Sequence, residues 1–260
     1  MRNFVVFWLI ISALVLAPLV ASAAFKDGLV LYLALDEGSG NTAGDLSGNG
    51  HNGEINKSVW VDGKYGKALQ FEGDGSGTFV TVASTDALNV NEMTFMAWIN
   101  AETWDGTRQI VGKSVHGGCS GRVQYGVFSE SGVFKARFSA EGGSVDVVTD
   151  LPPVNEWVHL AVTNDGAKAL IYINGEEVMS GDVSGKLTVN DDPWRLGQDC
   201  ERENYIFTGI IDDARLWNRA LSKDEINEFK GMGAEILESG TAVEPQDKLP
   251  TTWARLKAAR

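Results

Sequence analysis

The sequence predicts an all-β fold of the sandwich or barrel class, and three observations predict it. Apolar residues recur with a period of two in many short runs, which is the pattern of half-buried strands. Glycine is abundant, with 30 residues, and proline is scarce, with 6. Gly, Asn, Asp or Ser borders each run and supplies turn geometry. The runs are residues 29–35, 68–71, 78–82, 93–100, 109–113, 123–128, 133–139 and 144–148.

The chain begins with the parts of a secretory signal peptide. Arg2 supplies a short positive region, residues 4–20 form an almost unbroken apolar run, and residues 21–23 offer the small side chains of a cleavage site. A membrane anchor is the alternative, because the run is near the lower limit for spanning a bilayer. Pro18 and the small residues fit cleavage better. We therefore expect a protein that is secreted or extracytoplasmic, in a periplasm or at a cell surface, without a membrane span after cleavage.

The clearest supersecondary signal is a meander over residues 156–179. Residues 156–163 alternate, with His159 on one face and Leu160 on the other. Asn164-Asp165-Gly166 makes a turn, residues 168–173 return, and Asn174-Gly175 is a hairpin signal that leads into residues 176–179. This region predicts three consecutive antiparallel strands.

One helix is predicted, over residues 223–230. Ser222 and Glu225 have the spacing of a capping box, and Leu221 and Ile226 stand where a hydrophobic staple would be. Beyond Gly231 the pattern weakens. We expect a signal peptide at residues 1–23, one domain at 25–231, and a polar linker and tail at 232–260. The tail is a docking peptide, a short amphipathic helix or a loosely ordered end.

Charge and cysteine content narrow the function. The formal net charge is −13, which argues against nucleic acid and anionic membranes as partners because both need clustered Lys and Arg. Many carboxylates are left for a hard cation. The two cysteines, Cys119 and Cys200, are an even count in an exported chain and predict one disulfide; two buried free thiols are the alternative.

Six segments, taken together, resemble laminin-G-like jelly-roll domains of the concanavalin A-like lectin and glucanase superfamily. The resemblance implies a two-sheet antiparallel jelly-roll sandwich, with about six or seven strands in each sheet, adjacent N- and C-terminal strands and one short C-terminal helix. The segments are residues 32–40 with 45–53, 66–71, 94–99, 157–162, 171–175 and 207–222.

The loop over residues 45–53 is the candidate metal site. It places several oxygen-bearing side chains within nine residues, and its glycines let carbonyl groups point inward, as Ca²⁺ requires. The resemblance implies a structural Ca²⁺ between this loop and Asp212. We expect Asp45, Asn49 and Asp212 as ligands, with Glu37 and Asp36 as substitutes. An Asx turn that satisfies its own backbone is the alternative.

Catalytic signals are weak. Glucanase members of the superfamily carry acids alternating along one strand, and no Glu-x-Asp-x-Glu strand occurs here. Glu201 and Glu203 have the spacing but read as a loop, and Asp212 and Asp213 are expected on opposite faces of a strand. No Gly-x-Ser-x-Gly elbow is present. We expect no enzyme.

Binding is the favoured function, with a glycan or an extracellular protein as the partner. A Cys119–Cys200 disulfide would join the loops over residues 115–122 and 198–205 at one rim. The ligand-binding residues expected there are Arg122, Tyr125, Arg202 and Tyr205. The strand tryptophans are expected mainly in the core, since large aromatic side chains bury well. A structural or adhesion element of the cell surface is the second hypothesis, and a glycoside hydrolase is the third.

Overall fold

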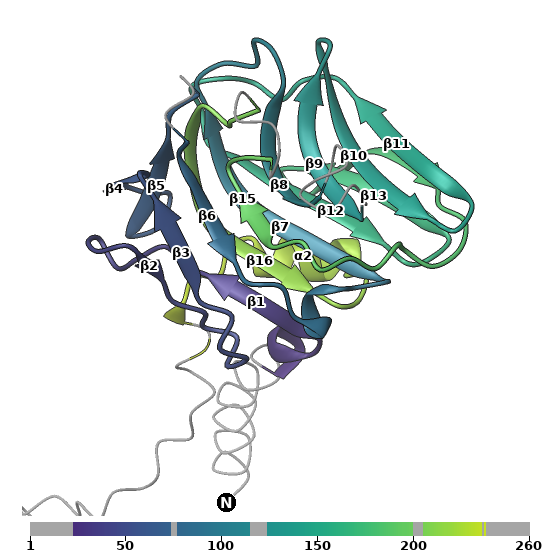
Figure 1. Ribbon diagram of the computed structural model, residues 1–260, viewed down its shortest axis with the longest axis horizontal. Helices are drawn as coiled ribbons and strands as arrows, with labels where there is room; N and C mark the ends of the chain where they lie inside the picture. Colours follow the sequence, from purple (N-terminus) through teal and green to yellow (C-terminus); the bar gives the residue numbers. More distant parts are fainter. Residues whose placement is uncertain (1–22, 74–76, 115–123, 200–204, 236, 238–260) are drawn as a thin grey trace, which may run out of the picture. The chain divides into compact units, whose positions relative to one another are not determined.

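Two antiparallel sheets stack as a sandwich in the computed structural model, which describes residues 23–73, 77–114, 124–199, 205–235 and 237 (Figure 1). The first sheet has the spatial order β14 (Glu176–Asp182), β13 (Lys168–Ile173), β12 (Val158–Asn164), β7 (Met93–Ala101), β16 (Gly209–Trp217), β5 (Lys67–Phe71) and β4 (Val59–Asp62), and β1 (Leu29–Leu33) also pairs with β16. The second sheet has the order β11 (Gly143–Thr149), β10 (Val133–Ala140), β9 (Tyr125–Glu130), β8 (Arg108–Lys113), β15 (Trp194–Leu196), β6 (Phe79–Val82), β3 (Gly53–Asn56) and β2 (Thr42–Ala43).

The jelly-roll prediction is confirmed. The terminal strands are adjacent, because β1 pairs with β16 from Leu29 to Leu33. The predicted meander forms β12, β13 and β14, and Asn174 and Gly175 adopt the positive φ values, 55° and 86°, that a tight hairpin turn needs. Each sheet has eight strands rather than six or seven, because short paired segments such as β2, with two residues, also count as strands.

The core lies between the sheets and follows the alternation of the strands. In β10 the buried side chains Phe134, Ala136 and Phe138 belong to the core, and the intervening Lys135 and Arg137 point outward. The same alternation sends Val158, Leu160 and Val162 of β12 inward. Burial of one such set from each sheet is the main stabilising term of a sandwich.

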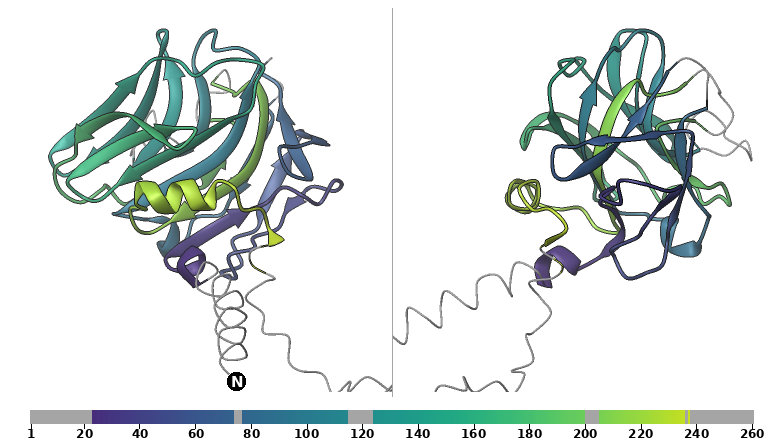
Figure 2. Two further views of the ribbon diagram at one scale, coloured as in Figure 1. Left: turned by 180° about the vertical axis from the view of Figure 1, so that it is seen from behind. Right: turned by 90° about the vertical axis from the view of Figure 1, so that its left-hand side faces the viewer.

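A helix covers part of the outer face of the first sheet. α2 (Lys223–Phe229) starts at Ser222, whose side chain and Glu225 form the predicted capping box. Its buried Phe229 stacks on Trp217 and contacts Phe25 at 5.2 Å between ring centroids. Figure 2 shows the helix lying across this sheet. Both faces of the first sheet are therefore buried near α2, which explains why all seven residues of β12 are buried.

The remaining described segments add little to the architecture. A short 3₁₀ helix, η1 (Asp86–Leu88), inserts Leu88 into the core. No helix in the described part of the chain has the length and apolar character needed to cross a membrane.

Candidate functional site

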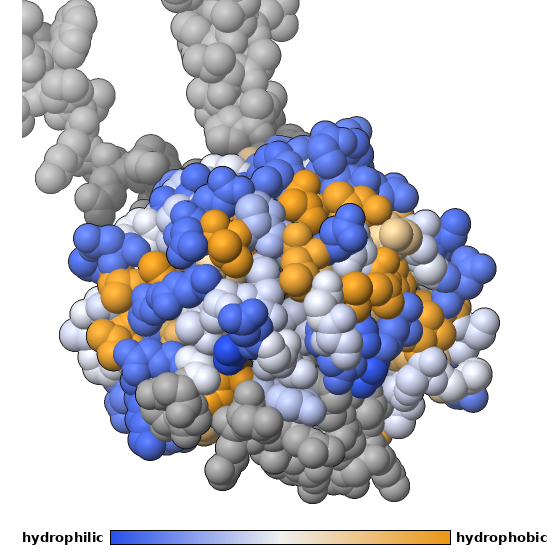
Figure 3. All heavy atoms as spheres, turned by 90° about the horizontal axis from the view of Figure 1, so that it is seen from above, coloured by the Kyte–Doolittle hydropathy of each residue, from blue (hydrophilic) through white to orange (hydrophobic). Residues whose placement is uncertain are grey.

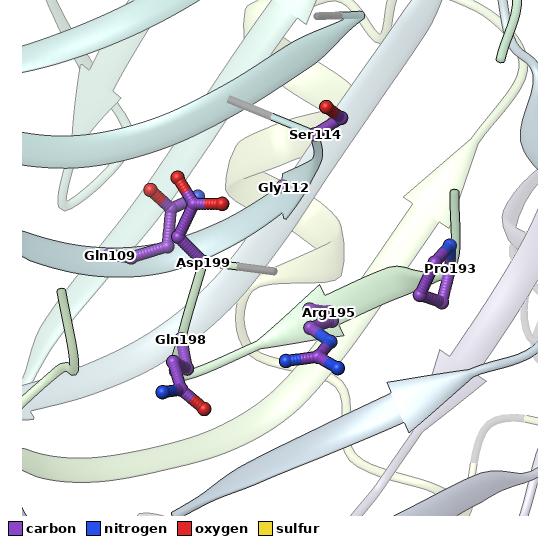
Figure 4. A pocket seen from close by; sticks show the side chains of 7 residues that line it. All are labelled: Gln109, Gly112, Ser114, Pro193, Arg195, Gln198 and Asp199. Carbon is purple, nitrogen blue, oxygen red and sulfur yellow. The ribbon is translucent and has the colours of Figure 1, made fainter. Parts of the chain in front are cut away.

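A narrow hollow lies on the second sheet, between β8 and β15. We call it the β8–β15 hollow; it encloses no water-sized space, and the volume of about 160 Å³ free of atoms there includes open solvent. Figure 4 shows side chains reaching it from β8 and from the stretch around β15. Its lining residues are Gln109, Gly112, Ser114, Pro193, Arg195, Gln198 and Asp199.

Strand alternation and register place these side chains. Trp194 and Leu196 are buried in the core, so the half-buried Arg195 between them points to the outer side of the sheet. Arg195 is paired with Gly112 of β8, and Gly112 is paired in turn with Gly126 of β9. The next residue in this row is Arg137. Two glycines thus stand between two outward arginines, and the sheet has only backbone there.

Three buried polar atoms in the hollow have no hydrogen-bond partner in the structure. They are the Oε1 of Gln109, the Oγ of Ser114 and the Nε of Arg195. The amide nitrogen of Gln109 is engaged, since it donates to the Val111 carbonyl at 2.6 Å. Buried polar groups in native proteins are nearly always paired, and each exception calls for an explanation such as a ligand or water. An acceptor, a hydroxyl and a cationic N–H among the described lining residues are therefore left unsatisfied.

Arg195 is fixed by an aromatic ring. Its guanidinium carbon lies 4.3 Å from the ring centroid of Phe79, which is a cation–π contact. Burial lowers the pKa of Arg195, and the nearby Asp199 carboxylate opposes that effect. The guanidinium remains charged at any physiological pH.

The sequence-predicted rim adjoins this hollow. Ser114 and Asp199 line it, and they are the last described residues before the segments 115–123 and 200–204. Cys119, Arg122, Cys200 and Arg202 belong to those segments and lie outside the described residues, so their pairing and ligand-binding roles stay predictions. The bases of the two predicted loops are therefore brought together.

The two rim tyrosines have different positions. Tyr205 is half-buried beside the hollow, where its carbonyl oxygen accepts a hydrogen bond from the N–H of Asp199 at 3.4 Å. Tyr125 is not a rim residue, because its side chain is 1% exposed and belongs to the hydrophobic core. Val127 points inward with it, so the alternation of β9 faces Tyr125 into the sandwich.

The Asp45 loop forms an Asx turn. Each carboxylate oxygen of Asp45 accepts two hydrogen bonds, at 2.8 to 3.0 Å. Oδ1 accepts the N–H groups of Tyr32 and Ser47. Oδ2 accepts the Ser47 hydroxyl and the His51 N–H. Asn49 donates its amide hydrogens to the carbonyls of Leu29 and Val30 at 3.1 and 2.9 Å. All acceptor positions of Asp45 are filled, which supports the self-satisfied turn that the sequence left as the alternative.

Asp212 lies at a different seam. β16 pairs with β5 up to Ile211 and with β1 from Ala214, and its register against β7 shifts between Asp212 and Arg215. Asp213 takes a positive φ of 53° at this bulge.

The bulge corrects the expectation that Asp212 and Asp213 point to opposite faces. Asp212 Oδ2 accepts the Tyr65 N–H at 2.9 Å, and Asp213 Oδ1 accepts the Tyr32 hydroxyl at 2.6 Å. The Tyr65 hydroxyl donates to the Lys230 carbonyl at the C-terminal end of α2. Asp213 pairs with Arg215 at 3.0 Å, and Arg215 donates to the Phe229 carbonyl of the same helix. Both acids therefore lie on the α2 side of the first sheet.

The role of Asp212 as a cation ligand stays a prediction. The Oδ1 of Asp212 is buried without a hydrogen-bond partner, and burial raises the pKa of Asp212 to about 8. The charges of Asp213 and of Asp36, one of the expected substitutes, contribute to that rise. Glu37 instead accepts the Gly44 N–H at 2.7 Å. Among the described residues, no cluster of three or more His, Cys, Asp or Glu side chains is placed to hold a metal ion.

Sequence reasoning missed Arg195 and Gln109. Arg195 had a signal, because it stands between two large apolar residues and must point away from them in a strand. Gln109 had none, since it reaches the hollow through a register shift between Gln109 and Val111 that depends on the pairing with β9.

The fold is a two-sheet antiparallel jelly-roll sandwich. The laminin G profile of the concanavalin A-like lectin/glucanases superfamily matches residues 74–227, more than half of the chain. The chain belongs to this family. It is also 29% identical over 82 residues to Adhesion G-protein coupled receptor V1 from Danio rerio, a match that covers 30% of this chain and 1% of the receptor.

Solved structures show the same fold. The binding domain of Paraclostridial Mosquitocidal Protein 1 has a TM-score of 0.64 and 21% identity, over 78% of this chain and 52% of that one. The binding domain of botulinum neurotoxin DC in complex with SialylT has a TM-score of 0.60 and 15% identity, over 79% and 52%. This chain therefore spans about half the length of the toxin domains.

A third structure matches over nearly its whole length. Domain 4 of AbnA, a GH43 extracellular arabinanase from Geobacillus stearothermophilus, in complex with arabinotriose, has a TM-score of 0.54 and 21% identity, over 77% of this chain and 97% of that one. Identities at this level establish the shared fold and leave the ligand to be argued from this chain's own residues.

Proposed function

We propose that this protein is an exported, non-catalytic binding module that recognises carbohydrate at the β8–β15 hollow. The observation that carries the proposal is the set of three buried polar atoms without partners in that hollow, on Gln109, Ser114 and Arg195. Sugar hydroxyl groups both donate and accept, so one ligand could satisfy an acceptor, a hydroxyl and an N–H together. Related folds that are solved with arabinotriose and with SialylT support the ligand class.

The polar character of the surface agrees with a carbohydrate ligand. Figure 3, which views the molecule from above, shows apolar side chains interspersed with charged and polar ones among the described atoms. Large contiguous apolar patches are typical of stable protein interfaces. A protein partner remains the alternative ligand, and the same experiment separates the two.

Non-catalysis rests on the placement of the acids. Asp212 and Asp213 lie on the α2 side of the first sheet and not at the β8–β15 hollow, and Asp213 is paired to Arg215. A glycosidase needs two accessible carboxyl groups across one bond. We expect no release of reducing sugar from any polysaccharide that the protein binds. Release that vanishes when a single carboxylate is removed would contradict the proposal.

The test of the site is a glycan array followed by calorimetry with matched variants. Gln109→Met removes the amide from the hollow and keeps an unbranched side chain of similar length. Gln70→Met makes the same change on the first sheet, where Gln70 donates to Glu102 at 2.6 Å. We expect Gln109→Met to bind the glycan roughly tenfold more weakly than the wild type, which corresponds to about 1.4 kcal/mol. The control Gln70→Met should bind with the affinity of the wild type. Equal affinity of both variants and the wild type would place the ligand elsewhere.

We further propose a structural Ca²⁺ held by Asp212 and Asp36, which revises the ligand set expected from the sequence. The unpartnered Oδ1 of Asp212 and its raised pKa fit a cation, because a positive charge would stabilise the ionised carboxylate in a buried place. A bound ion would supply that charge at the seam between β1, β5 and β16. Asp45 and Asn49 contribute through the fold of their loop instead.

A further inference from the structure

Arg195 differs from every other arginine in the described part of the chain. Each of the other four has a hydrogen-bonded protein partner, and Arg195 has neither a hydrogen bond nor an ion pair. The partners are Asp146 for Arg137 at 2.6 and 2.8 Å, Asp213 for Arg215 at 3.0 Å, Glu225 for Arg219 at 2.7 Å, and the Gly73 and Ile206 carbonyls for Arg108 at 3.4 and 3.2 Å.

This difference is unusual because the protein is strongly acidic. A chain with 35 Asp and Glu residues against 22 Lys and Arg residues has carboxylates to spare for each arginine. A half-buried guanidinium without an anion carries a desolvation cost that a pair would offset. The Asp199 carboxylate acts on Arg195 through space, but no hydrogen bond or ion pair in the described part of the chain joins the two side chains.

The geometry around Arg195 prepares it for a planar anion. Phe79 contacts the face of the guanidinium at 4.3 Å, so the ring holds one face and leaves the N–H groups at the edge to donate. Two parallel N–H groups match the two oxygens of a carboxylate. The Ser114 hydroxyl lines the same hollow and can donate to the same group.

The size of the hollow limits what enters it. The hollow has no enclosed room for a water-sized group, so a carboxylate would lie across its mouth and the body of an oligosaccharide would lie outside, over the sheet. Asp199 also lines the hollow and opposes an anion there. It lowers the affinity for an acidic ligand without forming an ion pair with Arg195.

We infer that the ligand of the β8–β15 hollow is an acidic carbohydrate, whose uronic acid carboxylate is bound bidentately by Arg195 with Ser114 as a second donor. The inference rests on the proposed function and names its ligand class. It predicts that the protein binds acidic glycans more tightly than neutral ones and that the contact between Arg195 and the carboxylate accounts for the difference in affinity.

The experiment compares tetragalacturonate with its carboxyl-reduced derivative, which has the same linkages and a hydroxymethyl group in place of each carboxylate. An array of acidic and neutral glycans is screened first. If the protein prefers another uronate glycan, that glycan and its carboxyl-reduced derivative replace the tetragalacturonate pair. We expect the wild-type protein to bind the acidic member about 10- to 100-fold more tightly, as one charged hydrogen-bonded pair provides. The preference should shrink as salt is raised.

Three variants test the residue. Arg195→Gln should lose the preference and keep the affinity for the reduced ligand, and Arg195→Lys should keep only part of the preference because it lacks the planar fork. Asp199→Asn should increase the preference. The matched control is Arg219→Gln, in the turn that follows β16, which should leave the ratio unchanged.

The outcomes separate this inference from the proposed function. An array that retains neutral glycans and no acidic ones, or a preference that survives in Arg195→Gln, overturns the acidic ligand and leaves carbohydrate binding intact. A preference for sulfated glycans that exceeds the one for uronates assigns the arginine to a sulfate instead and overturns the carboxylate. An array that retains no glycan overturns both.

Discussion

Arg215 and Arg195 are two guanidinium groups on aromatic rings, and their surroundings differ. Arg215 lies over Tyr32 at 4.6 Å and bonds to Asp213, to the Tyr32 hydroxyl and to the carbonyls of Phe229 and Met232. Arg195 lies over Phe79 at 4.3 Å and has no such partners. A buried cation that the fold neutralises supports the fold, whereas one left without an anion is free to bind a ligand. Arg215 therefore supports the fold on the α2 side of the first sheet, and under the proposed function Arg195 serves recognition on the second sheet.

The largest expected effect is on the α2 side. Arg215→Gln should lower the free energy of unfolding by about 3 to 5 kcal/mol, because it leaves the buried Asp213 carboxylate without its charge partner and frees two carbonyls at the end of α2. Denaturant titration followed by circular dichroism measures this. Arg215→Gln with Asp213→Asn should recover part of the loss. A single variant as stable as the wild type would contradict the structural role of Arg215.

The second prediction concerns the loops that flank the hollow. If Cys119 and Cys200 form the disulfide that the sequence predicts, its removal should cost about 2 to 5 kcal/mol in the chain-entropy picture. Mass spectrometry with and without alkylation tests the bond, and thermal melting of a double Cys→Ala variant tests its contribution. Two free thiols in the exported protein would disprove it. The same sample, sequenced from its N-terminus, tests cleavage after Ala23.

Calcium should stabilise the α2 side and leave the hollow unaffected. A hundredfold excess of free Ca²⁺ over its Kd should raise stability by about 2.7 kcal/mol, seen as a higher Tm that EDTA reverses. Asp212→Asn should abolish the response, because it removes the buried carboxylate proposed as a ligand. Asp45→Asn should lower the Tm with and without calcium, since it weakens the four hydrogen bonds of the Asx turn. Loss of the calcium response only in Asp45→Asn would restore the ligand set expected from the sequence.

His159 should give the α2 side a pH dependence. Burial, together with the charges of Arg215 and Lys230, lowers the pKa of His159 from 6.5 to about 3. A depressed folded-state pKa means that the unfolded chain binds the proton first, so stability is complete above pH 6.5 and falls as the pH drops toward 3. The slope should approach about 1.4 kcal/mol per pH unit for this group. Denaturant titrations from pH 7 to 4 should show a flatter curve for His159→Gln, and an unchanged curve would mean that carboxylates dominate this range.

Local signals in the sequence predicted much of the fold. The limits of β13 match the predicted residues 168–173, and the Asn174-Gly175 turn and the Ser222 capping box are present as expected. Each of these depends on residues a few positions apart, so the pattern contains the whole interaction.

The parts that the sequence did not predict depend on distant partners. The bulge at Asp212 and Asp213 exists because β16 changes its neighbour from β5 to β1, and no local pattern encodes that change. Tyr125 was placed at the rim for its chemistry, although its spacing from Val127 already indicated an inward face. The hollow combines β8 with β15, which are separated by about 80 residues along the chain.

The smallest expected effect on stability is in the hollow, and it is the sharpest test of the comparison. Arg195→Gln should change the free energy of unfolding by no more than about 0.5 kcal/mol, because the substitution breaks no hydrogen bond or ion pair and gives up only the contact with Phe79. It should be at least as stable as the wild type if the unneutralised charge is costly. Parallel denaturant titrations of Arg195→Gln and Arg215→Gln measure the contrast directly. A loss of several kcal/mol in Arg195→Gln would show that this arginine supports the fold as Arg215 does, and the assignment of recognition to the second sheet would then fail.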